Sequence, residues 1–162
     1  MKYILTLASF ISLMLLAFSH PFVKKKAYDF FLDRLVYRHT VDLLPIDSLD
    51  KAEVLLDTRS KREYEVSHLP NAIHIGYEGF AFDKVTNWQK NQVIVLYCSI
   101  GYRSERIGEQ LREAGYTQVY NLNGGAFKYV NQGLPLEGSK SIQIHPYSMW
   151  WGIWLSKGQK KY

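Results

Sequence analysis

The clearest pattern in the sequence is a short apolar run followed by a helical repeat. Val93-Ile94-Val95-Leu96-Tyr97 is unbroken and apolar, which is typical of a parallel strand that is buried on both faces. Ile107 and Leu111 then recur at helical spacing, and Gly115 offers a C-terminal stop. The loop that begins at residue 98 therefore connects the carboxyl end of a strand to the amino end of a helix.

A second apolar pattern occupies the start of the chain. Ile4 to Phe18 is almost wholly apolar, and Ala17 and Ser19 stand at the small-residue positions of a signal-peptidase site. A membrane-spanning helix needs about 20 apolar residues, so we interpret residues 1–19 as a cleaved export signal and expect a periplasmic protein. Lys24-Lys25-Lys26 follow closely, and a retained membrane anchor is the alternative, with the rest of the chain in the cytoplasm.

Residues 20–40 are predicted to form an N-terminal helical extension. Between Lys24 and His39 the apolar side chains recur on one face while the other face is mostly charged. The apolar positions are Ala27, Tyr28, Phe31, Leu32, Leu35 and Val36. We expect this helix to pack on the domain that follows it.

Residues 138–162 are predicted to form an aromatic-rich C-terminal extension. Ile142-Gln143-Ile144 alternates like a short strand, and Trp150, Trp151 and Trp154 follow within a few residues. Tryptophans this close together usually bury their rings, so we expect the tail to pack back on the domain. A membrane or protein contact through this tail is left open.

Composition limits the classes of protein to consider. The 162 residues are 47% hydrophobic, which suits one domain with extensions and excludes wholesale disorder. The net charge is +5, and lysines gather near both ends of the chain, where they could meet an anionic membrane surface or an acidic partner. We expect no nucleic-acid partner because no motif supports one. The histidines have no metal-ligand spacing with Cys98 or with each other, so we expect no metal.

Cys98 is the only cysteine in the chain, and it opens the loop Cys98-Ser99-Ile100-Gly101-Tyr102-Arg103-Ser104. Unpaired backbone N–H groups at the start of a helix favour an anion, so this thiol is expected to lose its proton readily. Arg103 adds a fixed positive charge. An isolated cysteine is more often a small buried hydrophobe, but its placement between strand and helix favours a nucleophile.

From about Val41 to Leu136 the chain resembles the rhodanese-like domain family. Residues 55–59 are similar to the family's Asp-x-Arg signature. Residues 67–73 are similar to its Gly-His-Ile-Pro-Gly-Ala-Ile motif, with Ser67 and Asn71 in place of the two glycines. Further similarities lie at Glu63-Tyr64, Leu122-Asn123-Gly124-Gly125, Tyr129 in place of the family's tryptophan, and Gly133-Leu134-Pro135. The domain is assigned to residues 41–137.

This resemblance implies an α/β three-layer fold, in which helices flank a central, mostly parallel five-stranded sheet. The expected strands are Val41–Leu44, Val54–Asp57, Ala72–Ile75, Val93–Tyr97 and Val119–Leu122.

The resemblance also implies a sulfurtransferase. Cys98 would take a sulfane sulfur from a small donor, hold it as a persulfide and pass it to a thiol or cyanide-like acceptor, without a cofactor. The substrate-binding residues would be Ser99, Ile100, Gly101, Tyr102, Arg103 and Ser104, through their backbone N–H groups. Ser99 and Ile100 carry no charge, so we expect inefficient use of thiosulfate and better use of an organic persulfide.

Two alternatives come from other classes of protein. One is a non-enzymatic persulfide carrier or protein-binding module. The other is a phosphatase or arsenate reductase, which is less favoured because only four residues separate Cys98 from Arg103, whereas those enzymes have five on this fold.

Three residues outside the loop are expected to support it. The family resemblance implies that Asp57 and Arg59 form a buried ion pair that braces the loop. His68 is interpreted as a hydrogen-bonding strut rather than a general base, since a preformed thiolate needs no base.

Overall fold

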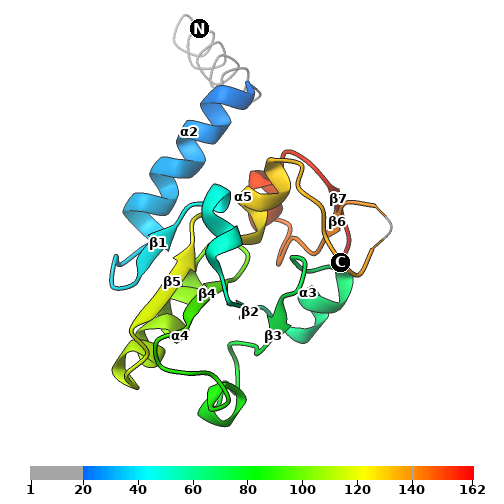
Figure 1. The fold of residues 1–162 in the computed structure, drawn as a ribbon. Helices are drawn as coiled ribbons and strands as arrows, with labels where there is room; N and C mark the ends of the chain where they lie inside the picture. Colours follow the sequence, from blue (N-terminus) through cyan, green and yellow to red (C-terminus); the bar gives the residue numbers. More distant parts are fainter. Residues whose placement is uncertain (1–19, 140) are drawn as a thin grey trace, which may run out of the picture.

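A computed structural model describes residues 20–139 and 141–162, so the predicted export signal or anchor at residues 1–19 lies outside the described part. The core is a five-stranded parallel sheet with strand order β1-β5-β4-β2-β3 (Figure 1). The strands are β1 (Asp42–Leu44), β2 (Val54–Asp57), β3 (Ile73–His74), β4 (Val93–Tyr97) and β5 (Gln118–Leu122). The expected α/β fold with its parallel sheet is confirmed.

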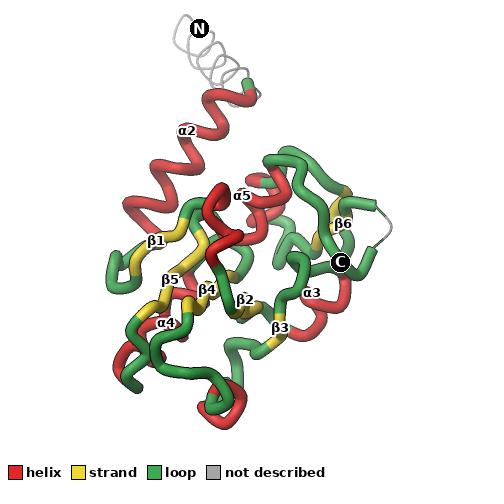
Figure 2. Tube along the Cα trace, in the orientation of Figure 1, coloured by secondary structure: helices red, strands yellow, loops and turns green. Residues whose placement is uncertain are grey.

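The helical elements lie on both sides of this sheet (Figure 2). Their bounds are α2 (Pro21–Phe31), η1 (Leu32–Val36), η2 (Ile46–Lys51), α3 (Lys61–Val66), η3 (Phe82–Val85), α4 (Tyr102–Glu113), α5 (Gly125–Asn131) and η4 (Trp151–Trp154). Alternate residues of β4 enter different cores, because successive side chains of a strand point to opposite faces. Val95 packs in the core that contains α5, and Leu96 packs in the core that contains α4.

The central position of β4 explains why its sequence is so apolar. It pairs with β2 on one side and β5 on the other, and Ile94 to Tyr97 are fully buried. Its carboxyl end is the edge at which open α/β sheets place their sites. Cys98 follows directly at this edge.

The N-terminal segment packs on the domain, but it differs from the single regular helix that the pattern predicts. The α-helix ends at Phe31, a π-helical turn continues to Val36, and His39 adopts a left-handed backbone with φ 57°. Tyr28 and Leu32 are buried in the core that contains α5. The helical segment thus ends at Val36, and residues 37–41 lead from it into β1.

The C-terminal segment returns to α2 and lies beside α5 (Figure 1). Trp154 stacks on Phe31 with 5.3 Å between ring centroids, and Trp151 lies 5.8 Å from the same ring. The segment also contains two short parallel strands, β6 (Gln143–Ile144) and β7 (Gln159–Lys160).

Two of the three clustered tryptophans pack against the N-terminal segment, but Trp150 does not. Trp150 is 78% exposed. In a 3₁₀ helix, residues three apart share a face. Trp151 and Trp154 therefore point together toward α2, and Trp150 falls outside that face.

Among the helices of residues 20–139 and 141–162, none combines the length and the apolar character needed to span a bilayer.

Candidate active site

The loop after β4 turns sharply so that its backbone can surround the Cys98 sulfur. Gly101 ends this turn with φ 107° and is the N-cap of α4. A Cβ atom at Gly101 would lie 2.5 Å from Cε1 of Tyr37. The glycine is thus required both by its left-handed backbone and by the close approach of the N-terminal segment.

Contacts with α5 fix the direction of the loop's peptide groups. The carbonyls of Cys98 and Ser99 accept hydrogen bonds from the backbone N–H groups of Ala126 and Phe127, at 2.8 and 3.0 Å. In a trans peptide the N–H points opposite to the carbonyl. Because the Ser99 carbonyl faces α5, the N–H of Ile100 is turned toward the sulfur.

The sulfur accepts backbone hydrogen bonds from within its own loop. The N–H of Gly101 lies 3.1 Å from Cys98 Sγ. The N–H groups of Ile100 and Ser104 also act on the sulfur and favour its charged form. The Gly101 carbonyl is held in turn by Asn121 Nδ2 at 2.9 Å, and the Ser104 hydroxyl bridges this carbonyl and the Asn121 side chain. β5 therefore helps to hold the loop through Asn121.

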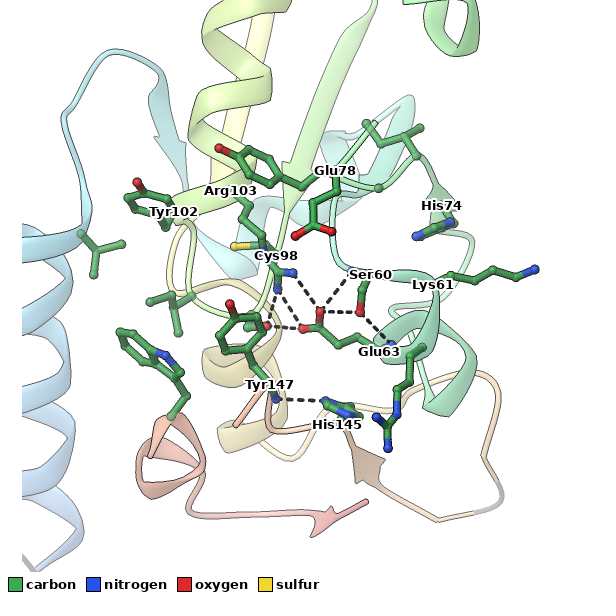
Figure 3. A pocket seen from close by; sticks show the side chains of 18 of the residues that line it. Ser60, Lys61, Glu63, His74, Glu78, Cys98, Tyr102, Arg103, His145 and Tyr147 are labelled. Carbon is green, nitrogen blue, oxygen red and sulfur yellow. Dashed lines mark hydrogen bonds and ion pairs between the residues drawn. The ribbon is translucent and has the colours of Figure 1, made fainter. Parts of the chain in front are cut away.

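Arg103 is fixed beside the loop by a buried carboxylate. Both terminal nitrogens of Arg103 donate to Glu63, each at 2.8 Å, and the Ser99 hydroxyl donates to the same carboxylate at 2.8 Å. Figure 3 shows this network next to Cys98. This bidentate geometry fixes the plane of the guanidinium.

The short helix α3 positions Glu63. Ser60 is the N-cap of α3, and Glu63 three residues later completes a capping box with it. Burial by itself raises the pKa of Glu63. The hydrogen bonds and the positive charge of Arg103, together with hydrogen bonds from Ser60 and Ser99, outweigh the effect of burial and lower the pKa to about 2. Glu63 is therefore ionised at neutral pH.

The surroundings of Cys98 favour its thiolate. Burial raises the pKa of the thiol, but the positive charge of Arg103 and the N–H donors of Ser104, Ile100 and Gly101 together lower it below its ordinary value. The fraction of thiolate at neutral pH is therefore higher than for a free cysteine, and the thiolate is the nucleophilic form of the side chain.

This lowered pKa can be measured by alkylation. The rate of Cys98 alkylation by iodoacetamide should rise with pH and reach half its maximum below the ordinary cysteine value of about 8.5. Arg103→Gln should move that midpoint upward because the positive charge is lost, whereas Arg103→Lys should move it less. A wild-type midpoint at or above that of a free thiol would contradict the assignment.

Asp57 and Arg59 form a buried ion pair below the loop. Arg59 Nη2 lies 2.6 Å from Asp57 Oδ2 and donates to the Ser67 carbonyl at 2.7 Å. The Arg59 guanidinium also lies over the ring of Tyr97, at 5.5 Å from its centroid. Tyr97 directly precedes Cys98, so the pair supports the end of β4, whereas Glu63 contacts the loop itself.

His68 joins α3 to the segment that follows α5. Its ring stacks on Tyr64 with centroids 3.9 Å apart, and its Nδ1 lies 3.0 Å from the Tyr64 carbonyl. Nε2 lies 3.6 Å from a carboxylate oxygen of Glu137. These contacts link two parts of the chain, which is a structural role.

A cavity of about 910 Å³ opens above the Cys98 sulfur. Of the predicted site residues it is lined by Cys98, Ser99, Ile100, Tyr102 and Arg103. In Figure 3, Tyr102 lies on the side of α2, whereas Lys61 and His74 lie on the opposite side of Cys98. Tyr147 stands between them, with the Arg103 guanidinium 5.0 Å from its ring centroid.

Within residues 20–139 and 141–162, no group of three or more His, Cys, Asp or Glu side chains is arranged to hold a metal ion. His145 lines the cavity, and its Nδ1 accepts a hydrogen bond from the N–H of Tyr147 at 3.1 Å. Burial lowers the pKa of His145, and nearby arginines lower it further against the opposing effect of Glu63.

Sequence reasoning missed three contributors to this site. Glu63 stands out in the sequence only as part of a family signature, although the Ser60-x-x-Glu63 capping box marks it as a fixed side chain at the start of a helix. Asn121 is a polar residue inside a buried strand, which is a signal for a hydrogen-bonded role. Tyr147 gives no signal, because only the fold brings the tail to the loop.

Comparisons with known proteins agree with the fold. A family model described as Rhodanese-like domain matches residues 46–132. A protein named tRNA uridine(34) hydroxylase from Erwinia tasmaniensis is 36% identical over 97 residues, which are 54% of this chain and 27% of that protein. The protein of the same name from Buchnera aphidicola is 33% identical over 104 residues, covering 57% and 33%. The chain thus spans about a third or less of the length of these relatives.

Solved structures share the fold at lower identity. The BH2092 protein from Bacillus halodurans has a TM-score of 0.54 and 22% identity, over 70% of this chain and 85% of that one. A polysulfide-sulfur transferase homodimer from Wolinella succinogenes has a TM-score of 0.50 and 23% identity, over 59% of this chain and 77% of that one.

Proposed function

Because the chain belongs to the rhodanese-like domain family, we propose that it is a sulfurtransferase in which Cys98 carries a sulfane sulfur as a persulfide. The observation that carries the proposal is the ring of N–H donors around Sγ beside the fixed charge of Arg103. Such donors stabilise an anionic sulfur in the same way as an oxyanion hole stabilises an oxygen.

The transfer has two halves, and each makes and breaks one bond. In the first, the Cys98 thiolate attacks the sulfane sulfur of the donor, an Sγ–S bond forms, and the donor leaves with the electron pair of its broken bond. In the second, a thiolate or cyanide-like acceptor attacks the outer sulfur, and Cys98 leaves as the thiolate. The N–H groups of the loop hold the anionic sulfur between the two halves.

The other features of the site support this class of chemistry over its rivals. Four residues separate Cys98 from Arg103, which suits a single sulfur better than a tetrahedral oxyanion. Cys98 has no second cysteine in the chain to form a disulfide with it, so a persulfide can persist until an external thiol arrives. The hydroxylase activity in the relatives' name is not part of the proposal, since the match covers so little of those proteins.

Intact mass spectrometry tests the proposal. The full chain, treated with a sulfur donor and then desalted, should gain the mass of one sulfur atom, and a reducing thiol should remove it. Proteolysis should place the added mass on the peptide that contains Cys98. Absence of the added mass with both thiosulfate and organic persulfides would overturn the proposal.

Turnover distinguishes an enzyme from a non-enzymatic carrier. An enzyme should release sulfur repeatedly to cyanide or to a small thiol. A carrier should form the same persulfide but turn over slowly with every small donor and acceptor. That second result would favour the alternative of a binding module that meets a protein partner.

Adding a positive charge at the loop should improve the use of thiosulfate. Ile100 lines the cavity and is only 7% exposed, so in Ile100→Lys we expect the stem to replace the apolar contact while the ammonium reaches the cavity. The kcat/KM for thiosulfate should rise several-fold, and the gain should shrink with added salt. Phe30→Lys, at an exposed position on α2, is the control for net charge. Equal effects of the two variants, or none, would contradict the loop-charge argument.

Location is a separate proposal that rests on residues 1–19. We propose export to the periplasm with removal of this segment, and membrane anchoring is the alternative. Intact mass of the protein from separated cell fractions distinguishes the two, because cleavage removes the apolar segment. Met149 and Trp150 are the most exposed of the large apolar side chains that the described tail leaves available for a membrane or protein contact.

A further inference from the structure

Residues outside the family domain build one wall of the cavity above Cys98. Phe31 and Val36 come from the N-terminal segment, and Tyr147 and Trp151 come from the C-terminal segment. All four lie outside the region 46–132 that matches the family. Phe31 and Trp151 also contact each other, with ring centroids 5.8 Å apart, so the two segments form one continuous apolar wall.

The size of the cavity argues against a small inorganic ion as its full occupant. Its volume of about 910 Å³ falls within the roughly 300–1,000 Å³ of pockets that bind organic ligands of drug size. Cys98 lines this same cavity. A ligand large enough to fill the cavity therefore contacts both Cys98 and the apolar wall.

The charge near the sulfur is already engaged by the protein. Glu63 occupies both terminal nitrogens of Arg103, and the ring of Tyr147 lies against the guanidinium. Lys61, Arg62 and Lys84 also line the cavity, but they belong to other parts of its wall, and Lys84 donates to the Ile75 carbonyl at 2.8 Å. Next to the sulfur itself, a dianion such as thiosulfate meets backbone donors and an arginine whose charge Glu63 already balances. Apolar side chains, by contrast, offer a large surface to an organic group.

We propose that Phe31, Val36, Tyr147 and Trp151 form a subsite for the organic part of a persulfide donor R–S–SH, in which R is an aromatic or branched apolar group. The inference rests on the proposed sulfur transfer and names the donor of that reaction. The Cys98 thiolate attacks the terminal sulfur, an Sγ–S bond forms, and the donor's own S–S bond breaks. RS⁻ leaves with the electron pair and takes a proton from solvent, so Cys98 is oxidised to a persulfide as the donor is reduced to a thiol.

Trp151 and Trp150 provide a matched pair of variants for the test. Trp151 lines the cavity, whereas its neighbour Trp150 is exposed and lies outside the lining. The full chain is assayed with benzyl persulfide and methyl persulfide. We expect wild type to favour the benzyl donor about tenfold in kcat/KM, from burial of the ring. Trp151→Ala should remove most of this preference, and Trp150→Ala should retain it.

Trp151→Phe and Tyr147→Ala keep the test decisive if Trp151→Ala unfolds. Trp151→Phe keeps an aromatic wall and should retain the preference. Tyr147 is more than half exposed, so its loss should weaken the preference without unfolding the protein. Equal use of the two donors by wild type would overturn the subsite, as would equal effects of Trp150→Ala and Trp151→Ala.

A binding measurement separates this inference from the proposed function. Benzyl methyl sulfide has no sulfur to transfer, and the Cys98→Ser protein cannot accept one. Calorimetric titration of the Cys98→Ser protein with benzyl methyl sulfide should show saturable binding. Adding Trp151→Ala should weaken this binding about tenfold. If no donor loads wild type but the thioether binds, the subsite stands and the proposed function fails. If methyl persulfide and thiosulfate load Cys98 while the thioether does not bind, the function stands and the subsite is overturned.

Discussion

Cys98→Ser is expected to reduce sulfur transfer to the uncatalysed background. Serine is nearly isosteric with cysteine, so the loop's hydrogen bonds can form around its oxygen, but that oxygen cannot form a persulfide. A hydroxyl also stays protonated at neutral pH even beside Arg103. Transfer is measured as thiocyanate formation with cyanide as acceptor, and as mass gained by the protein.

The interpretation of this variant requires an intact fold. The melting temperature and near-UV circular dichroism of Cys98→Ser should match those of wild type, because the replaced atom is enclosed by the same peptide groups. Appreciable transfer by a folded Cys98→Ser protein would show that Cys98 is not the sulfur carrier.

Asp57→Ala is expected to destabilise the fold strongly. Asp57 is 0% exposed and its partner Arg59 is 1% exposed, so the substitution leaves a buried guanidinium without its counter-ion. Removing one partner of a buried pair costs about 3–5 kcal/mol in the free energy of unfolding. Urea unfolding followed by circular dichroism measures this loss.

An exposed ion pair between β1 and α4 supplies the control for this change. Arg112 lies 2.6 Å from Asp42, but the side chain of Asp42 is 74% exposed. Asp42→Ala should therefore cost about 0–1 kcal/mol in the free energy of unfolding. If the two variants lost equal stability, the buried pair would not be the support that its geometry indicates.

The sequence is most informative where one strand and one turn specify the structure. The apolar run of β4 predicts a buried central strand, and the placement of Cys98 and Gly101 predicts a loop at the sheet's carboxyl edge. All five strands agree with their expected ranges to within one residue at each end. These features depend on local patterns of burial and on turn chemistry, which a sequence shows directly.

The rest of the site depends on contacts between distant parts of the chain. Nothing in the sequence around Tyr147 indicates that its ring meets Arg103, 44 positions earlier in the numbering. The π-helical turn at residues 32–36 follows from how the N-terminal segment fits the domain, since its apolar spacing equally suits a regular helix. Glu63 is recognisable as a bracing residue only once α3 is placed beside the loop.

Contacts between the N-terminal segment and Gly124 enlarge the part of the chain that must stay folded to hold the Cys98 loop. The Tyr37 hydroxyl accepts from the Gly124 N–H at 2.6 Å, and the Tyr28 hydroxyl donates to the Gly124 carbonyl at 3.1 Å. Gly124 precedes the α5 residues whose N–H groups hold the loop carbonyls. The unit that holds the loop is therefore larger than the segment shared with the family: a fragment trimmed to residues 46–132 would keep Ala126 and Phe127 but lose the two tyrosine hydroxyls that anchor Gly124 just before them.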